Sequence, residues 1–382
     1  MATHSFFRTM KRLILTLLTL VLLHGASLAC TSAIVAARRS SEGAALLWKH
    51  RDNGVYPNTR IEYISDGKYA YSAVVPDNEE YAKGVYAGIN EKGLGVISTA
   101  TMNLPKASPE EYKACKRRRI WGGVMWCALR ECATIDEFEA LLKRTKRSRG
   151  AHSNFGIGDA SGAVAYFEVW DLGYRRYDVS ESGNDGFDVR ANFSHAGNPK
   201  RKGSNVRRYK LMMSQMQGHS GTFSPRDFIN YSRSYNSLKY GNVLTSPKPY
   251  ICNNHTVPRY TSVGAVVIVC DAHNPRMLVM NGHPVSSIAV PVYVKAEHEI
   301  PQCVHGDAMR LLSNDFREKG YSLNADKKRV LNKEVVSSVL KINHPKIEMP
   351  REMPTNIRAF NADIDRKFAK HARRVRKVLK RF

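Results

Sequence analysis

The sequence has few acidic side chains, no closely paired cysteines and no long apolar run. Only 34 of its 382 residues are Asp or Glu, against 59 Lys or Arg, so the formal net charge is +25. None of its seven cysteines falls in a C-x-x-C pair, which leaves a zinc ribbon without support. No internal repeat of 20–50 residues is evident, so a repeat architecture is not expected. A hydrophobic content of 43% is typical of a globular protein and excludes a disordered chain.

The first 29 residues have the pattern of a targeting segment. Lys11 and Arg12 precede an apolar run over 13–23, about half the roughly 20 residues that a membrane-spanning helix needs. Ser27-Leu28-Ala29 then supplies small residues at the −3 and −1 positions of a signal-peptide cleavage site. We therefore expect an exported protein, periplasmic or secreted, that begins at Cys30.

Two other consequences of export concern cysteine chemistry. A lipoprotein would also begin at a cysteine, but Ser27 stands where a lipobox normally has Leu. In an oxidising compartment the other six cysteines could form up to three disulfide bridges.

The positive charge is concentrated in four places. Nine of the seventeen residues from Arg366 onward are Lys or Arg, and three further clusters lie near 113–119, 143–149 and 200–210. Export would separate the protein from nucleic acid, so no nucleic-acid partner is expected. An anionic membrane or envelope surface suits this charge better, with a solvated basic surface as the plainer alternative.

Hydrophobic patterning predicts an α+β fold of strand pairs and helices, since strands and helices do not alternate regularly. Residues 1–29 are interpreted as a signal peptide, 30–300 as the main domain and 301–382 as a basic, mainly helical extension. In that extension an apolar stripe predicts a helix that either docks on the core or lies on a membrane surface. The strands are expected at 31–37, 44–49, 154–158, 163–169, 174–179, 187–192, 264–271, 277–280 and 288–294, with a strand pair over 86–101 and helices at 120–132, 134–145, 208–216 and 225–234.

A mature chain that begins at Cys30 would carry a nucleophile and a base in one residue. The thiol has an ordinary pKa of about 8.5 and a free α-amine one of about 7.7–8. The amine can take the thiol proton and later return it to a leaving nitrogen, while the thiolate attacks an amide carbonyl. Cleavage before Cys30 is then a chemical requirement of the reaction.

Several segments are similar to one family, and they occur in the order that the family has. The chain resembles N-terminal-nucleophile hydrolases, in particular choloylglycine hydrolases, penicillin V acylases and isopenicillin-N acyltransferase-like linear-amide hydrolases. The resemblance covers roughly residues 30–295 and implies a four-layer αββα sandwich, with no metal or organic cofactor and with oligomers common. The segments that carry it are Cys30-Thr31-Ser32, Trp48-Lys49-His50-Arg51-Asp52, Gly88-Ile89-Asn90-Glu91-Lys92-Gly93-Leu94-Gly95-Val96, Asn154-Phe155-Gly156-Ile157-Gly158-Asp159-Ala160-Ser161-Gly162 and Arg190-Ala191-Asn192-Phe193-Ser194.

The resemblance also implies site residues at matching positions. Cys30 would be the nucleophile and Asp52 would hold its amine. The family usually has Arg three residues before that Asp, where this chain has Lys49; Lys49 keeps the charge without the guanidinium fork, and Arg51 is the alternative.

Two further roles follow from the same resemblance. Asn192 would donate to the oxyanion, with a second donor from the backbone near 99–101, where Ala100 replaces an Asn. Arg208 matches a late Ser-x-x-x-Arg-aromatic segment, and Arg207 is its rival.

The predicted activity is hydrolysis of a linear, non-peptide amide, or transfer of its acyl group. Bile-salt conjugates, N-acyl amino acids, acylated signalling amides and penicillin-type side chains all fit as substrates. A Cys–His pair is a separate possibility, with His50, His152, His195 or His255 as the base. The alternative function is a lipid-anchored or inactive binding protein on the same scaffold.

Overall fold

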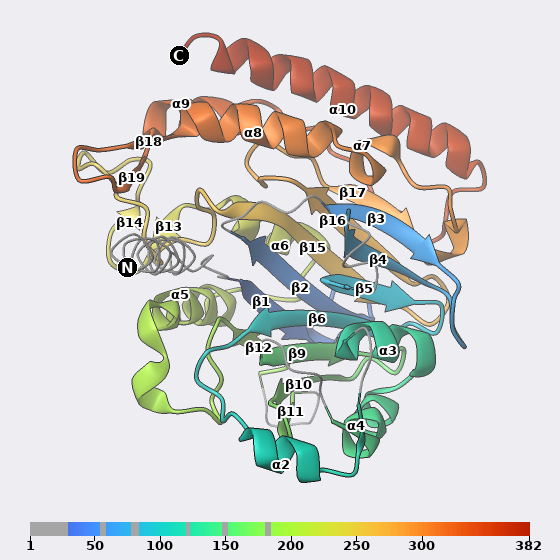
Figure 1. The fold of residues 1–382 in the computed structure, drawn as a ribbon. Helices are drawn as coiled ribbons and strands as arrows, with labels where there is room; N and C mark the ends of the chain where they lie inside the picture. Colours follow the sequence, from blue (N-terminus) through green and yellow to red (C-terminus); the bar gives the residue numbers. More distant parts are fainter. Residues whose placement is uncertain (1–29, 54–58, 78–83, 120–122, 147–151, 180–184) are drawn as a thin grey trace, which may run out of the picture.

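Two antiparallel sheets form the centre of the molecule (Figure 1). The structure is a computed structural model, and it describes residues 30–53, 59–77, 84–119, 123–146, 152–179 and 185–382. The first sheet has the order β12-β1-β2-β15-β16-β17, whose strands are β12 (Phe187–Arg190), β1 (Thr31–Val35), β2 (Ala45–Asp52), β15 (Ser262–Cys270), β16 (Arg276–Asn281) and β17 (Val290–Tyr293). The second has the order β11-β10-β9-β6-β5-β4-β3, whose strands are β11 (Tyr174–Asp178), β10 (Val164–Val169), β9 (Ser153–Gly158), β6 (Gly95–Ala100), β5 (Ala87–Asn90), β4 (Tyr71–Pro76) and β3 (Thr59–Ile64).

The sheets pack face to face, and helices cover their outer faces. Strands β1 and β2 contact β6 and β9 across the interface. Successive side chains of a strand point to opposite faces: Leu47 packs between the sheets, whereas Leu46 and Trp48 pack toward α5 (Val206–Gln217) and α6 (Pro225–Arg233). On the outside of the second sheet lie α3 (Val124–Glu131) and α4 (Ile135–Arg144). This is the predicted αββα sandwich, so the fold-class prediction is confirmed.

Local sequence signals explain most element boundaries, with differences of a few residues. The predicted pair over 86–101 is β5 and β6, joined at Asn90 to Gly95. The Thr134 hydroxyl caps α4 by accepting the Glu137 N–H. In a complete capping box the Glu137 carboxylate would accept the Thr134 N–H, but here it accepts the Ala133 N–H. The patterns missed β3, β4 and α2 (Pro109–Ala114).

The remaining short elements connect these layers. They are the strand pairs β7 (Arg118–Arg119) with β8 (Thr145–Lys146), β13 (Asn236–Ser237) with β14 (Gly241–Asn242), and the 3₁₀ helices η1 (Ala37–Arg39), η3 (Pro199–Arg201), η4 (Gly203–Asn205) and η5 (Val294–Ala296).

The C-terminal segment is helical and shares a core with the sandwich. It comprises α7 (Gln302–His305), α8 (Ala308–Gly320), the hairpin β18 (Tyr321–Leu323) and β19 (Arg329–Leu331), α9 (Lys333–Leu340) and α10 (Ile357–Leu379). Helices α7 and α8 contact β16, and α10 lies over α7, α8 and α9 at the top of Figure 1. Val304, Leu312 and Phe316 belong to the same buried cluster as Ile268 and Val279 of the sheet.

The predicted apolar stripe of α10 faces this core. Its buried members are Ile364, Phe368, Ala372, Val375 and Leu379, whereas Phe382 is 41% exposed. The stripe therefore docks on the protein, because its apolar surface is already buried between helices. None of the described helices has the length and apolar character needed to cross a membrane. All seven cysteines lie in the described part and carry free thiols, so the three bridges that the sequence allows are not formed.

Candidate active site

Cys30 stands directly before β1, the strand between β12 and β2, and its side chain lines a cavity. The cavity has a volume of about 290 Å³, and the Cys30 side chain is only 6% exposed. Its Sγ lies 3.9 Å from the backbone oxygen of Asp52 at the end of β2. The register pairs Thr31 with His50, which places Cys30 opposite Arg51 and next to Asp52. Trp126 and Phe155 are aromatic residues that line the same cavity.

Strand β2 delivers charged side chains to both faces of its sheet. Lys49 and Arg51 share the face of Leu47, toward the second sheet, and both line the cavity. His50 and Asp52 share the opposite face with Trp48. A strand with alternating side chains can therefore bring cations to the cavity while keeping a carboxylate on the other face of the sheet.

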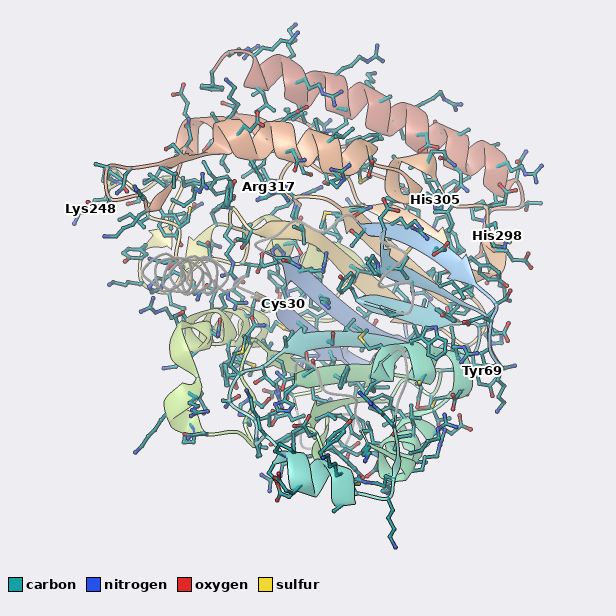
Figure 2. All side chains as sticks on the ribbon, in the orientation of Figure 1. Cys30, Tyr69, Lys248, His298, His305 and Arg317 are labelled. Atoms are coloured by element: carbon teal, nitrogen blue, oxygen red, sulfur yellow. The ribbon has the colours of Figure 1, made fainter. Side chains whose placement is uncertain are left out.

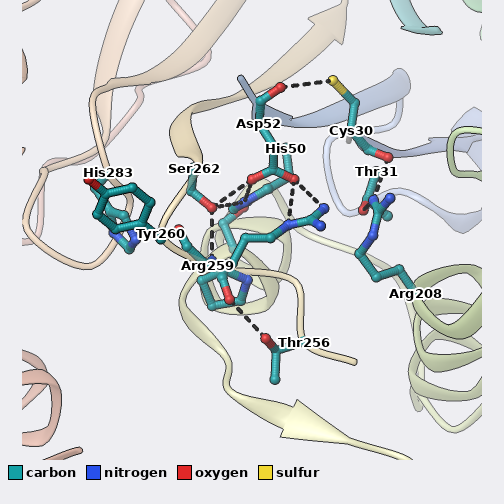
Figure 3. Close-up of polar contacts among 12 residues, drawn as sticks. Cys30, Thr31, His50, Asp52, Arg208, Thr256, Arg259, Tyr260, Ser262 and His283 are labelled. Carbon is teal, nitrogen blue, oxygen red and sulfur yellow. Dashed lines mark hydrogen bonds and ion pairs between the residues drawn. The ribbon is translucent and has the colours of Figure 1, made fainter. Parts of the chain in front are cut away.

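Asp52 is fully buried and held by three neighbours (Figure 3). Its Oδ2 accepts from Arg259, at 2.6 Å from Nη2 and 3.1 Å from Nε. Its Oδ1 accepts from the Ser262 hydroxyl at 2.7 Å and lies 3.4 Å from His50 Nε2. Burial by itself raises the pKa of Asp52, but the Arg259 and His50 charges outweigh it and hold that pKa well below its ordinary value. The carboxyl group is therefore an anion at neutral pH.

Arg259 and Ser262 were not predicted as site residues. They belong to the turn that leads into β15, and Arg259 is separated from Asp52 by 207 positions in the chain. Pro258 before Arg259 signals a turn, but a turn signal carries no information on which distant carboxylate an arginine meets.

Arg208 reaches the nucleophile from α5. Its Nη1 donates to the Cys30 carbonyl oxygen and the Thr31 hydroxyl, each at 2.6 Å. Its Nη2 donates to Asn192 Oδ1 at 2.9 Å and to Asn205 Oδ1 at 2.8 Å. Complete burial, followed by the nearby Arg259 charge, lowers the pKa of Arg208 to about 9, so it remains a cation at pH 7.

The neighbouring Arg207 is exposed and points away from this cluster. The buried face of α5 comprises Arg208, Leu211, Met212 and Met216. Their three- and four-residue spacing is a signal in the sequence that favours Arg208 over Arg207.

Asn192 is the second residue after β12 and links the two sheets. Its Nδ2 donates to the Ala100 carbonyl at 2.8 Å, which uses one of the two hydrogens of that amide. In β6, Ala100 is opposite Ser153, while the Thr101 N–H donates to the His152 carbonyl. Ala100 and Ser153 are therefore a non-hydrogen-bonded pair, so the Ala100 N–H points away from β9. Because Ala100 lines the cavity, this places a backbone N–H and a side-chain amide close together.

Lys49 and Arg51 are buried cations that pack on Tyr86. The Lys49 Nζ donates to the Tyr86 carbonyl at 2.7 Å and contacts the Ser98 hydroxyl at 3.4 Å. The Arg51 guanidinium stacks 3.7 Å from the centre of the Tyr86 ring. Burial lowers the pKa of both groups, that of Lys49 to about 8. The structure thus places both alternatives for the family Arg beside Cys30.

The four histidines considered as bases have other partners. His50 lies 2.9 Å from the Ser262 hydroxyl, on the face of β2 opposite the cavity. His152 pairs with Asp171 at 3.3 Å. His195 packs against Phe193 and Tyr209, and His255 against Tyr240.

Comparison with known proteins gives structural neighbours only. No protein-family model matches the sequence, and no curated protein matches it. A mutant of the conjugated bile acid hydrolase from Clostridium perfringens is similar, with 11% identity, 70% of this chain and 93% of that chain covered, and a TM-score of 0.44. Penicillin V acylase from Agrobacterium tumefaciens has 15% identity, 70% and 86% coverage and a TM-score of 0.43. A penicillin G acylase from Alcaligenes faecalis has 12% identity, 55% and 54% coverage and a TM-score of 0.35.

Identities and TM-scores this low do not carry an activity across. What the site can do follows from its own geometry: a buried thiol at a cavity, an ionised carboxylate on the neighbouring strand residue Asp52, and the Asn192 amide bonded to Ala100 of the cavity wall.

Proposed function

We propose that this chain is a cysteine amidase that acts with Cys30 as its N-terminal residue and cleaves a linear, non-peptide amide bond. The single observation that carries the proposal is the place of Cys30, whose sulfur lines a cavity at the head of an inner strand, one residue in register from the Asp52 anion. Removal of residues 1–29 as a signal peptide would free its α-amine. The same signal peptide would direct export of the protein.

The reaction begins with transfer of the thiol proton to the Cys30 amine. The thiolate attacks the amide carbonyl and forms a C–S bond, while the carbonyl electrons move to oxygen. The Asn192 amide and the Ala100 N–H would donate to that oxyanion. Collapse of the intermediate breaks the C–N bond, and the Cys30 ammonium gives its proton to the leaving nitrogen. Water, or a second amine, then attacks the thioester and releases the acid or a new amide.

The charged side chains have distinct roles in this proposal. Asp52 stabilises the ammonium form of the Cys30 amine, and Arg259 keeps Asp52 ionised. Arg208 fixes the Cys30 carbonyl and so the direction of the nucleophile. Lys49 and Arg51 place two cationic side chains at the cavity beside the Cys30 sulfur.

Intact mass and N-terminal sequencing of the exported protein test the first step. We expect a chain that begins with an unmodified Cys30. A lipidated Cys30 would instead support the anchored binding protein, and an uncut segment would remove the base from the mechanism.

Substitution tests the nucleophile. The Cys30→Ala variant should show no turnover of an N-acyl amide panel, and a thioester adduct on wild-type enzyme should be visible by mass spectrometry and released by hydroxylamine. Cys115→Ala, at a partly exposed cysteine that does not line the cavity, should keep wild-type turnover. A Cys30→Ala enzyme that cleaves every substrate of the wild type would end the assignment.

We further propose that the outer face of α10 adsorbs to an anionic membrane surface. Lys370, Arg373, Arg374 and Lys377 are exposed there, while the apolar stripe is buried in the protein. The attraction would therefore be electrostatic, without insertion of the helix, and strongly dependent on salt.

A further inference from the structure

The turn of residues 259–262, which supplies two partners of Asp52, has two of its four backbone carbonyls held by one side chain of the C-terminal segment, Arg317. In this turn the Arg259 side chain and the Ser262 hydroxyl both bind the Asp52 carboxylate. Any displacement of the turn would move both groups relative to that carboxylate. The position of the turn thus decides how Asp52 is oriented.

Each backbone carbonyl of the turn has a defined donor. Arg317 of α8 donates through Nε to the Tyr260 carbonyl at 3.1 Å and through Nη2 to the Ser262 carbonyl. The Thr261 carbonyl accepts from the Asn53 N–H at 2.8 Å, and the Arg259 carbonyl lies 3.0 Å from His283 Nε2. Arg317 is only 4% exposed, and Figure 2 shows it below α8, on the side that faces the sheets.

His283 connects the turn to Tyr321, the residue that follows α8. The Val285 N–H donates to His283 Nδ1, so the proton of a neutral ring lies on Nε2 and is donated to Arg259. Burial, followed by the Arg317 charge, lowers the pKa of His283 far below its ordinary value, which keeps the ring neutral. The Tyr321 hydroxyl lies 3.1 Å from the same nitrogen, and its ring packs edge-on against Tyr260.

We propose that Arg317 and Tyr321 are positioning residues of the active site, so that the C-terminal helical segment is part of the catalytic apparatus. This rests on the proposed function, because the positioned group is the Asp52 carboxylate. The resemblance to known hydrolases ends near residue 295, before either residue. The segment thus gives this chain a support for Asp52 that the resemblance does not imply.

The test compares the same substitution in two backgrounds. We expect Arg317→Met to lower kcat about 10- to 100-fold in the wild type with a smaller change in KM, because orientation rather than binding is lost. In an Asp52→Asn background, where the oriented carboxylate is gone, the further loss measured by single-turnover acylation should be less than about 3-fold. A purely structural role would lower both backgrounds by the same factor.

Milder variants keep the test informative if Arg317→Met folds poorly. Arg317→Lys should recover part of kcat, and Tyr321→Phe, which keeps the ring but loses the hydroxyl, should lower kcat about 3- to 10-fold. Arg310→Met, on the same helix but in a solvent-accessible ion pair with Asp307, should stay within about 2-fold of wild type.

Two results would overturn the inference: equal losses in both backgrounds, or wild-type kcat in folded Arg317→Lys and Tyr321→Phe. These outcomes are separate from failure of the proposed function, which would show as unimpaired turnover by Cys30→Ala.

Discussion

The Asp52→Asn substitution should cost both activity and stability, and the two losses have different origins. Asp52 and Arg259 form an ion pair of 2.6 Å with side chains 0% and 9% exposed, so solvent screens it little. Replacement by Asn keeps the shape and one acceptor oxygen but leaves the Arg259 charge uncompensated beside Arg208. The sequence alone suggests that Asp52→Asn would lower activity with little loss of stability, but the structure shows that it disrupts a buried ion pair.

The magnitude follows from the charges. Two unit charges about 4 Å apart attract by roughly 4 kcal/mol at an effective dielectric constant of 20, and loss of one partner of a buried pair typically costs about 3–5 kcal/mol. Because Asn retains one hydrogen bond, we expect a loss of about 3 kcal/mol. For a folded domain of about 350 residues this corresponds to a Tm lower by roughly 4 °C.

The loss should depend on pH in one direction. Arg259 holds the folded-state pKa of Asp52 below its unfolded value, which is near 3.9. The stabilisation by this carboxylate is therefore complete above about pH 4 and is lost as the pH falls toward the folded-state pKa. The Tm difference between wild type and Asp52→Asn should be constant from pH 5 to pH 7 and shrink below pH 4.

Urea unfolding at these pH values and kcat/KM for an N-acyl amide measure the two effects. We expect kcat/KM to fall about 100- to 1,000-fold, since the ammonium loses its counter-ion. Asp77→Asn is the matched control, because Asp77 and Arg60 form an ion pair whose side chains are about one-third exposed. This substitution should change the free energy of unfolding by less than about 1 kcal/mol. Wild-type turnover of Asp52→Asn would remove Asp52 from the mechanism, and an unchanged Tm at pH 7 would refute the buried-pair reasoning.

Two other predictions concern cations. Burial lowers the folded-state pKa of Lys49 from 10.5 to about 8, so its ammonium destabilises the fold fully below pH 8 and progressively less toward pH 10.5. Lys49→Met should therefore raise Tm at pH 7, and this gain in Tm should shrink between pH 8 and pH 10.5. A gain in Tm that is independent of pH would contradict burial of the charge as its origin. Replacing Lys370, Arg373, Arg374 and Lys377 by Gln should weaken co-sedimentation with phosphatidylserine-containing vesicles about 1,000-fold at low salt, at roughly 1 kcal/mol per charge. The matched control replaces the exposed Lys106, Lys113, Lys116 and Arg118, and equal losses in the two variants would show that net charge, and not the α10 face, sets the binding.

The sequence alone determined the features that depend on neighbouring residues. The alternation of a strand sends Lys49 and Arg51 to one face and His50 and Asp52 to the other, although the predicted strand ended at residue 49 and only the structure extends it to Asp52. The apolar stripe of α10, the Thr134 cap and the strand pair over 86–101 also depend only on nearby residues. Helical periodicity, a capping hydroxyl and turn residues each act within a few positions of the chain. The position of Cys30 beside a cleavage pattern also needed no structure.

The tertiary structure decided which distant groups meet. Arg259 and Asp52 are brought together by the pairing of β15 with β2, and nothing local to either residue encodes that register. The same holds for Arg317, whose two carbonyl partners lie 57 and 55 positions away. Which distant polar groups pair depends on how the layers pack, because burial of the apolar faces fixes the order of the strands and the position of the helices. Buried polar side chains then bind the partners that this packing places within hydrogen-bond distance.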